Sequence, residues 1–184
     1  MAESPPDSLF HDLDDDLSSM RRYARSLCAD ASAADDVVQD SLLKALERRD
    51  SFRAQGSRKS WLLSIVHNVF VSGLRRRQAE SLRDQRFAET LTQQLPAEQE
   101  QQARLAEIAR SFAGLPELQR EVLHLVAIEG MSYQQAAEVL SVPIGTVMSR
   151  LSRARAAMRK HNDNDEHDDA QPASLRIVGG RDEE

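Results

Sequence analysis

The stretch MSYQQAAEVLSVPIGTVMSRLSRARAAMRK, residues 131–160, decides the fold that the sequence predicts. Ser132 is of a type that caps helices, and the apolar spacing after it predicts a short helix that reaches Leu140. Residues 141–143 then form a tight corner, and a second helix starts near Ile144. Two helices joined by so short a corner predict a helix-turn-helix unit.

A small residue and a branched residue indicate how these two helices pack. Ala137 allows the first helix to approach the second closely, and Val147, ten residues later, fills the angle between them. Val147 also begins an apolar stripe at helical spacing, which predicts that the opposite side of the second helix faces outward. A recognition helix in a DNA major groove needs such a side. Its candidate DNA contacts are Thr146, Ser149, Arg150, Arg153 and Arg155.

The charge of the chain is unevenly distributed. Residues 141–160 hold five cations and no acid, although the whole chain has a formal net charge of −6. Both ends are acidic, so residues 21–160 hold 16 acids and 22 bases. An ordinary amphipathic helix with a solvated charged face is the alternative, but charge of one sign after a capped helix and a corner favours DNA binding. Attraction to phosphates acts over a Debye length of ~8 Å, so the acidic average does not oppose it.

Composition and periodicity predict an all-α protein, because aromatic residues are only 4% of the chain and no convincing strand pattern occurs. We expect two small helical domains joined by a flexible linker. Their expected bounds are an acidic arm at 1–16, a first domain at 17–80, a linker rich in Gln and Glu at 81–102, a second domain at 103–160 and an acidic tail at 161–184. The tail is expected to be disordered, or else to dock through its LRIV segment on a partner or on the body.

Each domain has predicted helices with an inner apolar face. In the first domain we expect helices near 17–29, 33–49 and 57–77; in the second, helices near 105–112 and 116–130 precede the helix-turn-helix. The helix near 33–49 has the inner stripe Val38, Leu42, Ala45 and Leu46, and the helix near 116–130 has Leu118, Val122, Leu125 and Val126.

Several classes of protein are not supported by the sequence. No phosphate loop, metal-spaced His/Cys cluster or nucleophile motif occurs, so we expect no catalytic residue, metal or cofactor. The single cysteine, Cys28, predicts a reducing compartment, and burial is a better explanation for it than redox sensing. No apolar run is long enough to span a membrane, and the N-terminus lacks a signal pattern. A cytoplasmic protein is therefore expected.

Three blocks in a fixed order narrow the function. DDVVQDSLLKALERRDSF at 35–52, SWLLSIVHNVFVSGLRRR at 60–77 and the block at 115–160 resemble the extracytoplasmic-function (ECF) sigma factors of bacterial RNA polymerase. The resemblance covers about residues 10–160. It implies a non-enzymatic transcription initiation factor that binds core RNA polymerase and recognises −10 and −35 promoter elements. It also implies response to stress and control by an anti-sigma factor.

The resemblance assigns roles to residues of both domains. The docking face for core polymerase would comprise Asp35, Asp36, Gln39 and Asp40. The melted −10 strand would be read from Ser64, His67 and Asn68, with Ser60 on the same polar stripe, because amide and imidazole groups can bond an exposed base edge. Phosphate contacts near this helix would come from Arg53, Arg58, Lys59, Arg75, Arg76 and Arg77. Core packing is the better explanation for Trp61 and Phe70, although both could stack on bases.

Two departures from the family pattern and two rival functions remain. Met148 stands where the family usually has Lys, which removes one cation from the recognition helix, and Ser141 stands at a corner that is commonly Gly. A sigma-like decoy that binds an anti-sigma factor without touching promoters would be expected to lose the basic residues of both helices, which this chain retains. A plain helix-turn-helix repressor leaves the first domain unexplained.

Overall fold

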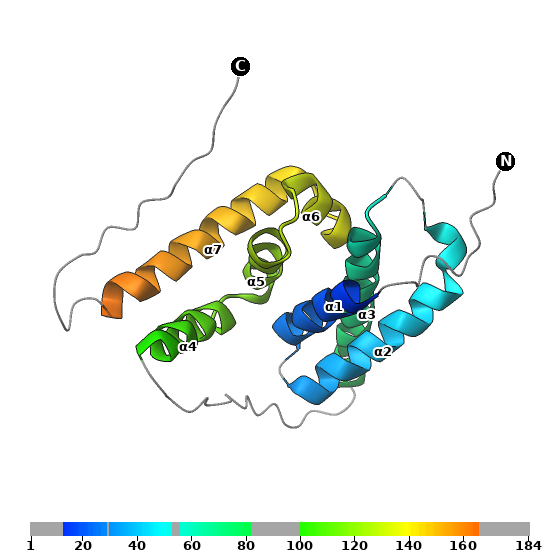
Figure 1. Ribbon diagram of the computed structural model, residues 1–184, viewed down its shortest axis with the longest axis horizontal. Helices are drawn as coiled ribbons and strands as arrows, with labels where there is room; N and C mark the ends of the chain where they lie inside the picture. The colour runs from blue at the N-terminus through cyan, green and yellow to red at the C-terminus, as the bar shows by residue number, and fades with distance from the viewer. Residues whose placement is uncertain (1–12, 29, 53–55, 82–99, 166–184) are drawn as a thin grey trace, which may run out of the picture.

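The computed structural model describes residues 13–28, 30–52, 56–81 and 100–165, and throughout these ranges the regular structure is helical (Figure 1). A first unit contains α1 (Asp14–Leu27), α2 (Ala31–Glu47), a 3₁₀ turn at Arg49–Ser51 and α3 (Arg58–Ser81). A second unit contains α4 (Glu100–Ala113), α5 (Glu117–Leu123), a π-helical turn at His124–Ile128, α6 (Tyr133–Leu140) and α7 (Ile144–Asp165). The predicted all-α fold is confirmed.

The three long helices of the first unit pack on one another around a common core. Asp30 starts α2, because its side chain accepts a hydrogen bond of 2.8 Å from the backbone N–H of Ala33. The core draws on all three helices and includes Met20, Tyr23, Ala24, Leu27, Val38, Ala45, Leu62, Leu63, Val66 and Phe70. Phe70 is thus a core residue as expected, and the half-buried Trp61 packs against Phe52, with ring centroids 5.4 Å apart.

The helix-turn-helix of the second unit forms as the sequence predicts. Ser132 and Gln135 cap α6 reciprocally, each side chain bonding the other residue's backbone N–H. Ser141 ends α6 in the left-handed conformation, with φ 54° and ψ 42°, in the position that favours glycine. Ala137 and Val147 are both buried, and the carbonyl of Ala137 accepts a hydrogen bond of 3.0 Å from Val142 N across the corner.

Two leucines that the apolar stripes place in the core are exposed. Leu46 is 48% exposed, because the buried side of α2 runs through Val38, Ser41 and Ala45, and Leu46 lies about 100° round the helix from Ala45. Leu118 is 52% exposed in the first turn of α5. The prediction of an inward position was wrong for both.

The two units pack against each other in this structure. Helix α1 contacts α5 and the π-helical turn, and α3 contacts α6 (Figure 1). The sequence predicts two bodies separated by a linker at 81–102; of that segment, residues 82–99 lie outside the described residues, and α4 already begins at Glu100. Most of the predicted arm and tail also lie outside them, although α7 continues to Asp165.

Candidate nucleic-acid interface

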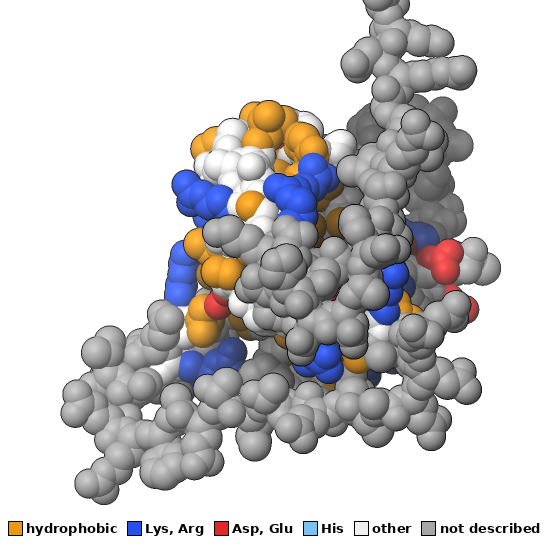
Figure 2. Space-filling view, turned by 90° about the vertical axis from the view of Figure 1, so that its left-hand side faces the viewer, with side chains coloured by type: hydrophobic (Ala, Val, Ile, Leu, Met, Phe, Trp, Pro, Cys, Tyr) orange, Lys and Arg blue, Asp and Glu red, His pale blue; other side chains and the backbone are white. Residues whose placement is uncertain are grey.

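Helix α7 presents the outward side that the sequence predicts. The side chains of Ser149, Arg153 and Arg155 are exposed, whereas Thr146 and Arg150 are partly buried. Ser149 Oγ donates a hydrogen bond of 3.0 Å to the carbonyl of Thr146, which orients it along the helix surface. Seen from the side where α4 and α7 lie in Figure 1, the upper part of the molecule shows Lys and Arg side chains among uncharged ones (Figure 2). This surface is suited to contact with phosphates and base edges.

Helix α3 divides its predicted strand-reading residues between the surface and the interior. Asn68 is exposed and available. Ser64 Oγ donates to the carbonyl of Trp61 at 2.7 Å, inside its own helix. His67 is buried, and its Nδ1 lies 3.4 Å from Tyr23 Oη of α1. In this arrangement, therefore, only part of the predicted −10 surface faces solvent.

The predicted phosphate contacts of the first unit are distributed in the same way. Arg75, Arg76 and Arg77 are exposed in the second half of α3. At its start, Arg58 pairs with Asp16, and Lys59 extends toward the second unit. Arg53 lies outside the described residues.

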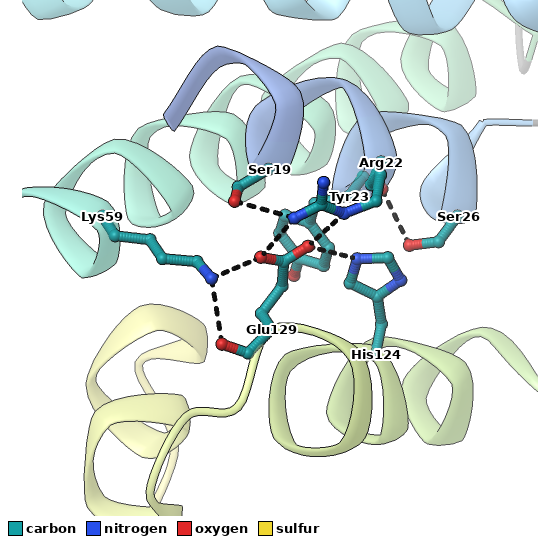
Figure 3. A network of polar contacts seen from close by, with 7 residues as sticks. All are labelled: Ser19, Arg22, Tyr23, Ser26, Lys59, His124 and Glu129. Atoms are coloured by element: carbon teal, nitrogen blue, oxygen red, sulfur yellow. Dashed lines mark hydrogen bonds and ion pairs between the residues drawn. The ribbon is translucent and has the colours of Figure 1, made fainter. Parts of the chain in front are cut away.

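Lys59 is part of a polar network that joins the two units through one carboxylate (Figure 3). Glu129, whose side chain is fully buried, accepts hydrogen bonds from Arg22 of α1 at both oxygens, Nε to Oε1 at 3.0 Å and Nη2 to Oε2 at 3.2 Å. Lys59 Nζ lies 2.6 Å from Oε2 and donates to the carbonyl of Glu129 at 2.9 Å. Ser19 Oγ accepts a hydrogen bond of 3.0 Å from Arg22 Nη2. Three side chains of the first unit thus surround one acidic side chain of the second.

The backbone before Glu129 explains its position. Glu129 N bonds to the carbonyl of His124, five residues earlier, so the helix widens into a π turn. Gly130, with φ 69°, then ends the helix in a conformation that glycine adopts readily. This ending leaves the Glu129 side chain against α1 and α3.

The charge state of this network follows from its surroundings. Burial raises the pKa of Glu129, but hydrogen bonds from Arg22, Lys59 and Ser19 outweigh it and lower the pKa to about 2. Burial lowers the pKa of His124 to about 4, against the opposing effect of Glu129. The His124 ring, with Nε2 at 3.4 Å from Glu129 Oε1, is therefore neutral at pH 7, and the ion pairs are those with Arg22 and Lys59.

Further contacts between the units surround this network. Arg120 of α5 donates from Nε to the carbonyl of Ser26, near the end of α1, at 2.6 Å. The same guanidinium also donates to the carbonyls of Ala113 and Leu115 within the second unit. The ring of Tyr23 lies 5.4 Å from that of His124, centroid to centroid. Both units thus supply polar and aromatic groups to one contact.

Comparison with known proteins identifies both units. Residues 14–80 match the family described as Sigma-70 region 2, and residues 105–158 match Sigma-70, region 4. The ECF RNA polymerase sigma factor EcfG of Rhodopseudomonas palustris is 39% identical over 153 residues, which make up 83% of each chain. The chain belongs to the ECF RNA polymerase sigma factors.

Solved structures agree with this assignment. The sigma factor RpoE of Bartonella quintana, solved with the anti-sigma factor NepR, has a TM-score of 0.74 and 31% identity, over 86% of this chain and 99% of that one. CnrH, solved with the cytosolic domain of CnrY, has a TM-score of 0.61 and 28% identity, over 87% of this chain and 90% of that one. This ECF sigma factor therefore shares its region 2 and region 4 architecture with both.

The predicted polymerase-binding side of α2 is exposed in this sigma factor. Asp35, Asp36, Gln39 and Asp40 all face solvent, and the last three line a groove of about 330 Å³ between α2 and α3. Arg76 and Arg77 line its other side, so the groove has acidic and basic walls. Leu43, one turn further along the same side of α2 and 60% exposed, was not singled out from the sequence. Its position one helical turn after Gln39 and Asp40 could have indicated that it belongs to the same surface.

The inter-unit network was not predicted from the sequence. Arg22 and Glu129 are 107 residues apart, and no local pattern relates two such positions. Among the described residues no cluster of His, Cys, Asp and Glu forms a metal site, and none of their helices has the length and apolarity of a membrane-crossing helix.

Proposed function

We propose that this ECF sigma factor binds core RNA polymerase and directs it to promoters, with the first unit reading a melted −10 strand and the second reading the −35 duplex. The helix-turn-helix carries this proposal, because Ala137 and Val147 are buried while Ser149 and Arg153 face outward on a helix without acids over residues 144–160. Nucleotide chemistry would belong to the polymerase, since the sigma factor supplies recognition and no catalytic group.

Docking on the polymerase would use the exposed side of α2. Three carboxylates and Leu43 lie on consecutive turns of this side, and such a surface suits a basic partner helix with apolar positions at its centre. The groove beside it, between α2 and α3, adds shape to the surface.

Promoter recognition would require the two units to separate. The −10 and −35 elements lie about 25 base pairs apart by their names, which is on the order of 80 Å at 3.4 Å per base pair. In this structure α1 and α3 contact α5 and α6 directly, and His67 of α3 is buried. The arrangement described here is therefore a closed form, and the polymerase would bind an open one.

An anti-sigma factor is the proposed regulator. Two similar sigma factors, RpoE of Bartonella quintana and CnrH, have been solved in complex with NepR and with the cytosolic domain of CnrY. By this similarity, a stress-linked inhibitor would hold this chain away from the polymerase in the cytoplasm.

Run-off transcription with purified core RNA polymerase on a pooled promoter library tests the proposal. The wild-type chain is expected to select templates that share two spaced elements. Arg153→Ala should lower transcription from these templates while leaving retention on core polymerase unchanged, because Arg153 is exposed on α7 and would contact only DNA. Arg104→Ala, at an exposed position of α4, is the matched control. A chain that binds an anti-sigma factor but initiates at no template would instead be a decoy.

A further inference from the structure

Three side chains on α1 and α3 form a cradle around the Glu129 carboxylate. Arg22 offers a two-pronged donor at 3.0 and 3.2 Å, and Lys59 offers an ammonium at 2.6 Å. The hydroxyl of Ser19 accepts a hydrogen bond of 3.0 Å from Arg22 and helps to lower the pKa of the carboxylate. We name Ser19, Arg22 and Lys59 the anion cradle. The whole cradle belongs to the first unit, whereas the anion in it belongs to the second.

The cradle has more positive charge than one carboxylate requires. Two cations, Arg22 and Lys59, face the single Glu129 carboxylate, so the charges of the three side chains sum to +1. A guanidinium fork, an ammonium and a hydroxyl around one point also suit an oxyanion with several acceptor oxygens, which is the chemistry of a phosphate. Even in the closed form the side chains of Arg22 and Lys59 are 49% and 32% exposed. The cradle therefore lies at the surface and becomes open when the units separate.

The position of the cradle indicates which phosphate would enter it. Lys59 lies in the first turn of α3, the helix whose exposed Asn68 is a predicted strand contact. Arg22 lies beside that turn on α1. A DNA strand that follows α3 would thus bring its backbone close to both cations.

We propose that the anion cradle binds a backbone phosphate of promoter DNA in the open form, and that Glu129 occupies the same site in the closed form. The proposal rests on the promoter recognition proposed above. Glu129 and the DNA phosphate exclude each other, so DNA binding and separation of the units favour one another. Ser19 and Arg22 become DNA contacts that no local motif indicates, and Glu129 becomes their intramolecular competitor.

The test separates a phosphate contact at Arg22 from a role in closure alone. Holoenzymes are assembled from core polymerase and three variants: Glu129→Gln, Glu129→Gln with Arg22→Gln, and Glu129→Gln with Arg21→Gln. Their affinities for a promoter fragment selected by run-off transcription are measured across a salt series. Arg21 is exposed on the same helix but lies about 100° away from Arg22, so its loss removes the same charge outside the cradle.

In the Glu129→Gln background, Arg22→Gln should weaken DNA binding about five- to ten-fold and reduce the salt exponent by about 0.7–0.9. Arg21→Gln should leave the affinity within about two-fold of the parent and should change the salt exponent by much less than Arg22→Gln does. Equal binding with and without Arg22 would overturn the proposal, since Arg22 would then act only in closure. A Glu129→Gln holoenzyme that binds more weakly than wild type would also overturn it, since Glu129 would then not be a competitor.

A methylphosphonate scan of the DNA provides a second test if Arg22→Gln lowers stability. Neutralising one phosphate should weaken DNA binding by the Glu129→Gln holoenzyme. Arg22→Lys keeps the positive charge but loses the two-pronged donor, so in that background neutralising the same phosphate should cost less affinity. If the effect of neutralising each phosphate is the same with Arg22 as with Lys at position 22, the cradle proposal is overturned. A wild-type chain that directs polymerase to no template overturns promoter recognition itself.

Discussion

Among single residues, Glu121 of α5 buries a carboxyl group that is incompletely hydrogen-bonded. Glu121 is 2% exposed, and its Oε2 atom has no hydrogen-bond partner. Burial, and after it the neighbouring charge of Glu117, raise the pKa of Glu121 to about 7, although the charges of Arg150 and Arg120 oppose the rise. Close to neutral pH the fold must therefore either protonate this carboxyl or bury a charge.

Replacement of Glu121 by Gln should change how stability depends on pH. A carboxyl whose pKa is higher in the folded chain than the ordinary 4.5 contributes stability below about pH 4.5, which is lost as the pH rises through 7. Glu121→Gln should thus be more stable than wild type at pH 8, by on the order of 2–3 kcal/mol, and the difference should shrink toward pH 5. Urea unfolding at both pH values measures it.

The control for this measurement is Glu47→Gln, at an exposed position of α2. Its stability should follow that of wild type at both pH values. A difference between Glu121→Gln and wild type that stays constant from pH 5 to pH 8 would show that Glu121 does not titrate in this range.

At the scale of elements, helix α2 exposes a large apolar side chain, that of Leu43, to solvent. Leu43 is 60% exposed on the side of α2 that also bears Asp36 and Asp40. Surface leucines alone need no explanation, but one set among carboxylates on a predicted docking side suits the centre of an interface.

Truncation of Leu43 should weaken polymerase binding without unfolding the chain. Leu43→Ala should lower affinity for core RNA polymerase about five-fold or more, because a central apolar contact in an interface is worth more than about 1 kcal/mol. Its unfolding free energy should stay within about 0.5 kcal/mol of wild type. Leu105→Ala, at a 67% exposed position of α4, is the matched control and should retain full affinity. Equal affinities in a pull-down or by anisotropy would remove Leu43 from the docking surface.

How far the sequence predicts the elements depends on the range of the forces involved. The helices, the Ser132 cap and the burial of Ala137 and Val147 follow from neighbours within about ten residues, and all were predicted. Leu46 was misplaced because an apolar side chain at the edge of a helical stripe does not show which side a partner covers. The π turn before Glu129 was not predicted, since no residue type near it marks a turn that is one residue wider.

The same distinction between local and long-range contacts decides which features of the candidate site could be predicted. The exposed positions of Asn68, Ser149 and Arg153 follow from helical periodicity, which places them opposite buried stripes. The burial of His67 does not, because it depends on packing against other helices, including Tyr23 of α1. Periodicity within one helix carries no information about a surface that closes over it.

At the scale of the whole molecule, polar groups form several of the contacts between the units, and inter-domain contacts of this kind permit relative motion of the domains. Ion pairs to Glu129, the Arg120–Ser26 hydrogen bond and the Tyr23–His124 ring contact join surfaces that would be solvated on separation. The charge of Arg150 of α7 also lowers the pKa of His67, after the larger effect of burial, so these two predicted DNA contacts lie near each other in the closed form. Under the promoter recognition proposed above, the chain would have to open before it could reach both promoter elements.

Energy transfer between dyes on the two units should report this opening. With Cys28→Ser, cysteines placed at the exposed positions Ser32 of α2 and Ser152 of α7 label one unit each. Glu129→Gln removes the charge shared by Arg22 and Lys59, which should cost the closed form about 1–2 kcal/mol and shift the ratio of closed to open about five- to thirty-fold. Transfer should fall, and Arg120→Gln should lower it as well. Glu138→Gln, whose carboxylate bonds Gln134 within α6, should leave transfer unchanged. Transfer that is insensitive to Glu129 but lost on addition of core polymerase would show that apolar packing holds the units together and that the polymerase separates them.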